Sequence, residues 1–278
     1  MIGVAGAGTM GAGIAQAAAQ AGLEVRIADQ SLAFAERAIA GIASGLARMV
    51  ARGRLDEAER SAIMERIRPA AFIGELADAP LVIEAVIEVM AVKSEVLREL
   101  DAAAGPATVL ASNTSTLPIT ELAAATARPD RVIGMHFFNP VHAMKLVEVI
   151  RGLRTSDETV ETVRSLAQRL GKTPVVVNDG AGFVSNRLLA PMINEAIYAL
   201  MQGVGSREDI DTIMKLGANH PMGPLELADL IGLDVCLDIL VTLHRSFGDK
   251  FLPAPLLRQM VAAGYLGRKT GRGFYPYD

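Results

Sequence analysis

Three glycines near the start of the chain have the spacing of a phosphate-binding turn. A short apolar run leads into Gly6, and Gly8 and Gly11 complete a GxGxxG pattern. In such a turn the first glycine permits the tight bend, the second lets the backbone approach a pyrophosphate, and the third lets a helix pack closely on the strand. Thr9 and Met10 then lie in the first turn of that helix, whose free N–H groups and dipole favour anions. We therefore expect these five residues to bind a dinucleotide.

A carboxylate follows at the distance that dinucleotide binding requires. The helix after Gly11 stops at Gly22, a strand covers residues 25–28, and Asp29 follows that strand. The separation of Gly11 and Asp29 is close to the spacing of about 20 residues expected for an acid that binds the ribose hydroxyls. Because its charge would repel a 2'-phosphate, Asp29 favours NAD over NADP as the cofactor. The pattern of glycines also occurs in ordinary turns, but the strand, the helix and the acid together favour the cofactor site.

A histidine and a glutamate near the middle of the chain could form a general base. His136 lies at the end of a predicted strand, and Glu148 lies in the next one, residues 146–150. A reversal of the chain near His142 would place the two side chains opposite each other. A histidine beside a carboxylate has a fixed tautomer and a stabilised imidazolium, as a general base requires. The alternative is that Glu148 is only an outward residue of an alternating strand, and the pattern by itself leaves both possibilities open.

Alternating strands and helices position these residues. Up to about residue 178 the alternation predicts a parallel, doubly wound sheet of the Rossmann type, in which ligands bind beyond the carboxyl ends of the strands. The strands are expected at residues 1–5, 25–28, 70–73, 81–86, 108–111, 132–135, 146–150 and 175–177.

Between the strands of the first part, helices are expected near residues 9–21, 31–54, 56 onward, 91–104, 118–125 and 157–170.

The second part of the chain has a different pattern. After a break in composition at residues 178–180 the pattern is helical to the end, with segments near residues 182–201, 207–216, 224–247 and 255–263. We therefore expect an α/β fold with a dinucleotide-binding domain over residues 1–178 and an all-helical domain over residues 179–278.

Composition excludes several other classes of protein. The formal net charge of −4 gives no electrostatic footprint for nucleic acid. The single cysteine, Cys236, allows no intramolecular disulfide, and the four histidines have no metal-ligand spacing, so no metal site is expected. No stretch predicts a membrane span. We expect a soluble protein of the reducing cytoplasm, with no membrane partner.

The same residues carry a resemblance to a known family. The chain resembles the L-3-hydroxyacyl-CoA dehydrogenases, and most of all their bacterial single-function 3-hydroxybutyryl-CoA dehydrogenases. The likeness extends over nearly the whole chain, in order, and rests on residues 6–11, 111–115, 136–140, 145–149, 179–186 and 221–224. Only the first of these motifs is generic, so the combination is specific.

The resemblance implies a reaction and assigns roles to four residues. His136 would be the catalytic base that removes the proton of the 3-hydroxyl while hydride passes from C3 to NAD. Glu148 would orient and polarise His136. Ser115 and Asn186 would hold the substrate hydroxyl or carbonyl, with Ser115 also beside the cofactor. Positioning the two reactants is the main task of such a site, because the cofactor supplies the hydride chemistry.

The resemblance also implies further cofactor contacts. Glu88, Lys93 and Asn139 match family residues that contact NAD, and Lys269 matches a late lysine that reaches back toward the cofactor. Without the family, a solvated surface charge would be the simpler interpretation of both lysines.

The substrate implied by the family is an acyl-CoA thioester, whose phosphates need cations. Arg48 and Arg52 form a basic edge on the helix after Asp29 and would bind coenzyme A. Arg52 falls where the family often has a lysine, a change that keeps the charge but alters the geometry. The apolar residues of the helical domain, such as Leu225 and Leu237, together with the resemblance, indicate a homodimer through this domain.

Two alternatives remain open at this level. A relative of the same outline could oxidise a free hydroxy acid such as gulonate, or a dicarboxylate ester such as 3-hydroxyadipyl-CoA. The second alternative is a non-catalytic NAD-binding protein with a structural function, like crystallin-type relatives. The presence of Ser115, His136, Glu148 and Asn186 together argues against the non-catalytic alternative. The basic edge favours a CoA ester over a free acid.

Overall fold

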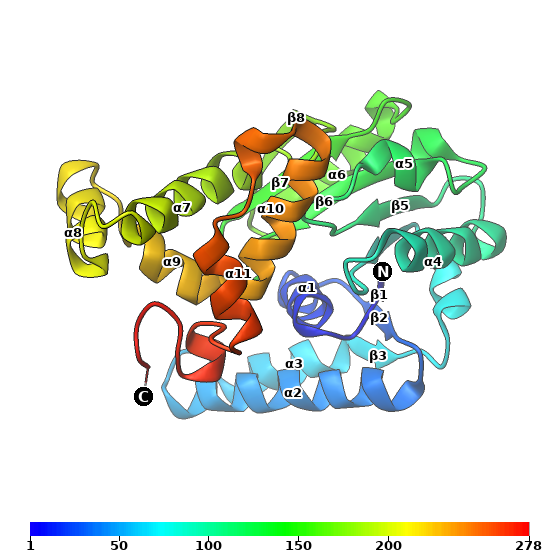
Figure 1. Ribbon diagram of the computed structural model, residues 1–278. Helices are drawn as coiled ribbons and strands as arrows, with labels where there is room; N and C mark the ends of the chain where they lie inside the picture. The colour runs from blue at the N-terminus through cyan, green and yellow to red at the C-terminus, as the bar shows by residue number, and fades with distance from the viewer. Residues whose placement is uncertain (278) are drawn as a thin grey trace. The chain divides into compact units, whose positions relative to one another are not determined.

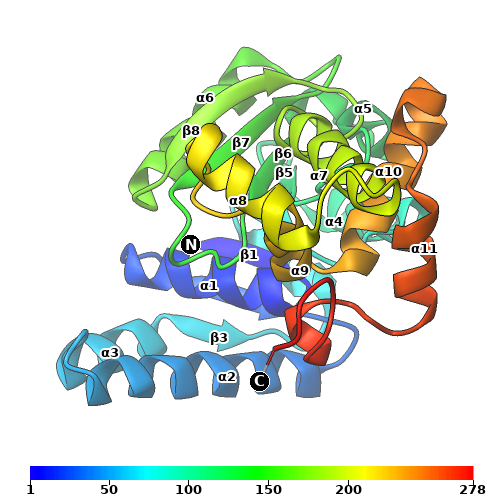
Figure 2. The ribbon, with the colours of Figure 1, turned by 60° about the vertical axis from the view of Figure 1, so that its left-hand side comes forward.

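The computed structural model describes residues 1–277 and shows two compact units. The first covers Met1–Gly180, and the second begins at Ala181. The ribbon can be followed in Figure 1 and, turned by 60°, in Figure 2. None of the helices in the described part of the chain combines the length and the apolar character that crossing a membrane requires.

The first unit is built on one sheet of eight strands in the order β3-β2-β1-β4-β5-β6-β7-β8. The six strands from β3 to β6 are parallel, β7 runs antiparallel to β6, and β8 is parallel to β7. The parallel sheet that we predicted is therefore correct for six strands. The strands are β1 (Ile2–Ala5), β2 (Val25–Ala28), β3 (Ile67–Pro69), β4 (Leu81–Glu84), β5 (Val109–Ser112), β6 (Val132–Phe137), β7 (Leu146–Arg151) and β8 (Thr173–Asn178).

Helices cover both faces of this sheet, which is why strands such as β1 and β4 are buried along their whole length. Right-handed crossovers place α1 and α4 on opposite faces, because β2 and β5 lie on opposite sides of the central pair β1 and β4. Side chains of α1, α2 and α6 share one apolar core with the strands. The helices are α1 (Thr9–Gln20), α2 (Leu32–Ala51), α3 (Glu57–Glu65), α4 (Met90–Ala103), α5 (Ile119–Ala123) and α6 (Asp157–Arg169).

Helix starts differ in a way that matters for the site. The Asp56 side chain accepts from the backbone N–H of Glu59 and completes a capping box at the start of α3, and Ser156 caps α6 through Thr159. Gly8, the N-cap of α1, offers no side-chain hydrogen bond. The first N–H groups of α1 are thus left for another acceptor.

The strand predicted at residues 70–73 is wrong. The chain pairs with β2 earlier, at Ile67–Pro69. Strand β3 lies at the edge of the sheet, where proline is tolerated because no further strand needs the N–H that proline lacks. Residues Ile73–Asp78 form a 3₁₀ helix instead, which buries Leu76. The apolar residues of this segment belong to a short helix that packs beside the sheet and do not form a strand.

The second unit is all-helical, as predicted, with α7 (Ser185–Met201), α8 (Arg207–Gly217), α9 (Pro224–Ile231), α10 (Leu233–Phe247) and α11 (Pro255–Ala262). The segment predicted as one helix over residues 224–247 is two helices. Gly232 separates them with φ +106, a backbone conformation that only glycine adopts freely and that interrupts the helical path. Ile193, Leu225 and Leu240 are among the residues of the apolar core of this unit.

Candidate active site

Of the three glycines of the turn, two have no room for a side chain and one faces open space. A Cβ atom at Gly6, which has φ +109, would lie 2.5 Å from the carbonyl oxygen of Ala85, and one at Gly11 would lie 1.8 Å from that of Gly6. At Gly8 such an atom would meet nothing within 4 Å. Packing therefore requires glycine at positions 6 and 11. At Gly8 the backbone faces open space and is accessible to a ligand.

A cavity of about 320 Å³ lies at this turn. Its lining includes Gly8, Thr9, Met10 and Asp29, and on the other side Val86 at the end of β4. The cavity thus combines the uncapped start of α1, which favours an anionic group, with a carboxylate at the end of the neighbouring strand. These features fit a dinucleotide.

Asp29 also fixes the turn itself. Its Oδ2 accepts a hydrogen bond from the backbone N–H of Ala7 at 2.6 Å, and its Oδ1 accepts from that of Gln30 at 2.7 Å. The carboxylate is therefore held in one orientation at the cavity. Each oxygen can still accept a second hydrogen bond, such as one from a ribose hydroxyl.

His136 and Glu148 form a buried pair. The antiparallel register of β6 and β7 places them directly opposite each other, as the sequence pattern allowed. Nδ1 of His136 and Oε2 of Glu148 are 2.8 Å apart, and the two side chains are only 6% and 4% exposed. When Nδ1–H donates to the carboxylate, Nε2 carries the lone pair and can accept a proton. The arrangement therefore has the chemistry of a general base.

Glu88 anchors the loop that carries Ser115. Its Oε1 accepts from the hydroxyl of Thr114 at 2.6 Å and from the backbone N–H groups of Ser115 and Thr116 at 2.8 and 3.1 Å. Burial raises the pKa of Glu88, but the charge of Lys93 and these hydrogen bonds outweigh it, so the pKa lies below its usual value. Glu88 is thus a carboxylate held ionised beside Ser115.

Lys93 is not the solvated surface charge of the simpler interpretation. Its side chain is 1% exposed, and its Nζ donates to Oε1 of Glu84 at 2.8 Å and to the carbonyl of Val86 at 3.1 Å. Nζ also lies 3.2 Å from Oε2 of Glu88. The lysine therefore belongs to a buried charge network at the end of β4.

Sequence reasoning missed Glu84 in this region and named Asn113 only within residues 111–115, with no role of its own. Glu84 is fully buried at the end of β4. Asn113 accepts from the backbone N–H of Phe137 at 2.9 Å and so ties the loop of Ser115 to the strand of His136. The only signal for Glu84 was a charge that ends an apolar strand.

The other predicted residues are Asn139, Arg48 and Arg52 in the first unit, and Asn186 and Lys269 in the second. Asn139 is exposed just after β6, and Arg48 and Arg52 are exposed at the end of α2. A helix rises about 1.5 Å per residue, so Arg48 lies roughly 25 Å along α2 from its first residue. In the second unit, Asn186 lies in the first turn of α7, and Lys269 pairs with Asp234 at 2.6 Å.

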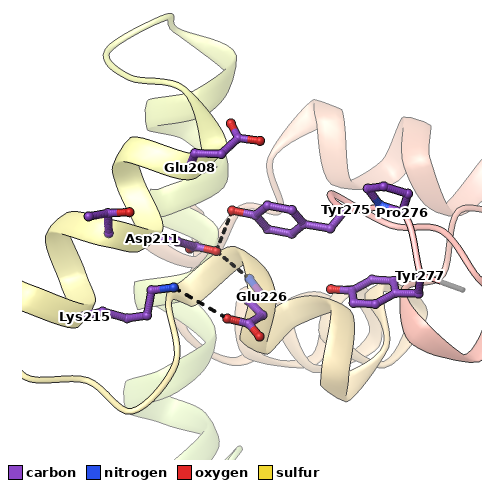
Figure 3. A pocket seen from close by; sticks show the side chains of 8 residues that line it. Glu208, Asp211, Lys215, Glu226, Tyr275, Pro276 and Tyr277 are labelled. Atoms are coloured by element: carbon purple, nitrogen blue, oxygen red, sulfur yellow. Dashed lines mark hydrogen bonds and ion pairs between the residues drawn. The ribbon is translucent and has the colours of Figure 1, made fainter.

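A second pocket, of about 340 Å³, lies in the helical unit and holds none of the predicted site residues (Figure 3). Asp211 accepts from the hydroxyl of Tyr275 at 2.9 Å and from the N–H of Glu226 at 3.0 Å. Lys215 lies 4.0 Å from the carboxylate of Glu226. These contacts hold α8 to α9 and to Tyr275. Within residues 1–277 no group of three or more acidic, histidine or cysteine side chains could hold a metal ion.

The fold and the cavity at the glycine-rich turn define the protein as a dinucleotide-binding one. Residues 1–180 match the family model of the 3-hydroxyacyl-CoA dehydrogenase NAD-binding domain, and residues 182–277 match that of the 3-hydroxyacyl-CoA dehydrogenase C-terminal domain. The chain belongs to the 3-hydroxyacyl-CoA dehydrogenase family, and its cofactor is NAD.

Relatives with assigned names agree with this assignment over nearly their whole length. A probable 3-hydroxybutyryl-CoA dehydrogenase of Bacillus subtilis is 56% identical over 99% of this chain and 96% of its own. A 3-hydroxybutyryl-CoA dehydrogenase of Bradyrhizobium diazoefficiens is 50% identical over 99% and 94%. The crystal structure of (S)-3-hydroxybutyryl-CoA dehydrogenase from Ralstonia eutropha superposes with a TM-score of 0.94, at 51% identity, over 100% of this chain and 98% of that one.

Proposed function

We propose that this protein interconverts (S)-3-hydroxyacyl-CoA and 3-oxoacyl-CoA, with 3-hydroxybutyryl-CoA and acetoacetyl-CoA as the substrate pair. The observation that carries the proposal is the buried pair of His136 and Glu148 in the unit that binds NAD. The names of relatives that are at least 50% identical over the whole chain support the substrate.

In the proposed reaction His136 moves the proton. Nε2 accepts the proton of the 3-hydroxyl during oxidation and returns it to the 3-oxo oxygen during reduction. Bound NAD would supply the acceptor for the hydride of C3. The carboxylate of Glu148 keeps the imidazole in the required tautomer and stabilises the imidazolium that forms.

The other predicted site residues would position the reactants. Ser115 and Asn186 would hold the oxygen on C3, so that the base and the hydride acceptor are aligned with it. Arg48 and Arg52 would bind the phosphates of coenzyme A, since guanidinium groups match phosphate geometry.

The cofactor contacts complete the proposal. The turn at Gly8 would hold the pyrophosphate and Asp29 the adenosine ribose. Glu88, Lys93, Asn139 and Lys269 are proposed to contact or support the rest of NAD. Glu88 and Lys93 would also support the cofactor indirectly, because each holds the backbone of a neighbouring loop by a hydrogen bond.

We also propose a homodimer through the helical unit, in the reducing cytoplasm. Four apolar side chains of this unit are strongly exposed in the single chain, namely Leu188, Val204, Ile213 and Leu216. An apolar surface of this kind favours a partner subunit. Light scattering of the purified protein should give twice the mass of 29.4 kDa.

The decisive experiment follows NADH consumption by the purified protein with acetoacetyl-CoA, beside NADPH and beside free acetoacetate. Turnover with NADH and the thioester alone would support the proposal. Turnover with free acetoacetate instead would favour a hydroxy-acid dehydrogenase. NADH binding without turnover of either compound would favour the non-catalytic alternative.

A further inference from the structure

Five residues at the carboxyl ends of β4 and β5 form a closed ring of hydrogen bonds and one ion pair. Lys93 donates to Glu84 at 2.8 Å, and the other oxygen of Glu84 accepts from the hydroxyl of Ser112 at 2.6 Å. Ser112 Oγ accepts from the backbone N–H of Thr114 at 3.2 Å, and the hydroxyl of Thr114 donates to Glu88 at 2.6 Å. Glu88 closes the ring through its ion pair with Lys93 at 3.2 Å.

Glu84 is the residue on which this ring depends. It is 0% exposed, and its two oxygens receive three hydrogen bonds, from Lys93, the N–H of Val86, and Ser112. A buried carboxylate is stable only when it is paired and hydrogen-bonded in this way. Because Glu84 lies opposite Ser112 in the parallel register, one carboxylate joins the ends of two adjacent strands.

The ring lies on one side of the phosphate-binding turn. β1 stands between β2, which ends at Asp29, and β4, which ends at Glu84. A dinucleotide lies across the ends of the strands, with its pyrophosphate at the turn after β1. If its adenosine half extends toward Asp29, its other half extends toward β4 and β5, where the ring is.

We propose that Glu84 is a positioning residue for the nicotinamide half of the site. It holds Lys93, which holds Glu88, and Glu88 fixes the backbone of Ser115 and Thr116. The part that concerns Ser115 and turnover rests on the proposed function. The part that concerns cofactor binding rests only on the ring and on NAD.

Replacing the carboxylate by an amide removes the charge of Glu84 while keeping the shape of the side chain. In Glu84→Gln the amide N–H group either faces the donors Lys93 and Val86, which costs hydrogen bonds, or faces Ser112, whose hydroxyl can turn to accept from it. Lys93 also loses one of its two anionic partners and is drawn more strongly to Glu88. The hydrogen bonds from Glu88 to the loop of Ser115 then weaken.

The test compares NADH with ADP-ribose, which lacks nicotinamide. Calorimetric titration of the full chain should show that Glu84→Gln weakens NADH about tenfold, equivalent to one lost interaction of about 1.4 kcal/mol. Its affinity for ADP-ribose should stay within about threefold of wild type. In the acetoacetyl-CoA assay kcat should fall about 100-fold with little change in KM, as expected for a displaced reacting group.

Asp101→Asn is the matched control. Asp101 is a largely buried carboxylate of the same unit that pairs with Arg128, and it lies in the last turn of α4, away from the ring. It should leave both affinities and kcat near wild type, whatever it does to the melting temperature. A loss in Asp101→Asn equal to that in Glu84→Gln would overturn the proposal, since general destabilisation would then explain both.

Three further outcomes are informative. Equal weakening of NADH and ADP-ribose in Glu84→Gln, or no weakening of either, would overturn the role in the nicotinamide half. A wild-type protein that binds NADH but does not turn over acetoacetyl-CoA would refute the proposed function, whereas the comparison of the two ligands would still decide the role of Glu84. If Glu84→Gln does not fold, Ser112→Ala replaces it, because this variant breaks the ring at its uncharged side. It should weaken the binding of NADH but not that of ADP-ribose, and unchanged NADH binding would overturn the proposal.

Discussion

Replacing Glu148 by glutamine tests the central pair most directly. The amide keeps the size of the side chain and an oxygen that can accept from Nδ1 of His136. What it removes is the negative charge beside an imidazole 2.8 Å away. The variant therefore separates the orientation of His136 from the stabilisation of the imidazolium.

The expected magnitude follows from the geometry. Two unit charges about 4 Å apart at an effective dielectric constant of about 20 interact by about 4 kcal/mol. If about half of the positive charge has formed in the transition state, the loss is about 2 kcal/mol, which lowers kcat roughly 30-fold. Complete transfer of the proton in the transition state would raise the loss to about 1000-fold.

The pH profile of kcat is a second readout. Replacing the carboxylate by an amide removes the charge that would stabilise the imidazolium of His136, so the profile of Glu148→Gln should differ from that of wild type.

The assay is kcat for 3-hydroxybutyryl-CoA oxidation between pH 5 and 9, with Glu161→Gln as the control. Glu161 is an exposed carboxylate of α6 that pairs only with its own helix. A wild-type rate and profile in Glu148→Gln would refute the paired role and return Glu148 to an ordinary strand residue. Loss of activity with an unmoved profile would count against stabilisation of the imidazolium by the carboxylate.

Three further predictions concern other residues. His136→Ala should lower kcat by about 10²–10⁴, the usual contribution of a general base, while fluorescence titration finds NADH binding retained; lost NADH binding would make the residue structural. Asp29→Ala should weaken NAD much more than NADP, and equal losses would count against the ribose contact, because the lost bond to Ala7 affects both cofactors alike. Burial raises the pKa of Cys236 to about 12, so the native thiol should resist a disulfide reagent at pH 8 and react once per chain in denaturant. Since the unfolded thiol ionises near pH 8.5, Cys236 should also lower the melting temperature above that pH, and Cys236→Ala should lose less stability between pH 8 and 10.

Local features of the sequence were sufficient for the glycine-rich turn. Gly6, Gly8 and Gly11 lie within one turn and the start of one helix, so their spacing alone defines the geometry. The juxtaposition of His136 and Glu148 was also within reach, because an alternating pattern and one reversal fix the register of two neighbouring strands. Two predictions of elements are wrong. At residues 70–73 tertiary packing decides between strand and helix, and at Gly232 one glycine interrupts a helical pattern.

The ring around Glu84 could not be predicted in the same way. Its members come from β4, the loop after it, α4, and the end of β5 with its loop. Nothing in the spacing of Glu84, Ser112 and Lys93 indicates that they meet, because the contact depends on the order of the strands. Sequence reasoning therefore found Glu88 and Lys93 only through the resemblance, and could not see that one buried carboxylate holds both.

The carboxylates of the site explain how an acidic edge can serve negatively charged ligands. Asp29 is held by two backbone N–H groups, Glu88 by Lys93 and the loop of Ser115, and Glu148 by His136. Each charge is therefore offset by the protein before a ligand arrives. Because these hydrogen bonds form on folding, binding does not have to reorganise them, which is the condition for a preorganised polar site. A substitution that frees one of these carboxylates should accordingly harm ligand binding by repulsion as well as by the lost contact.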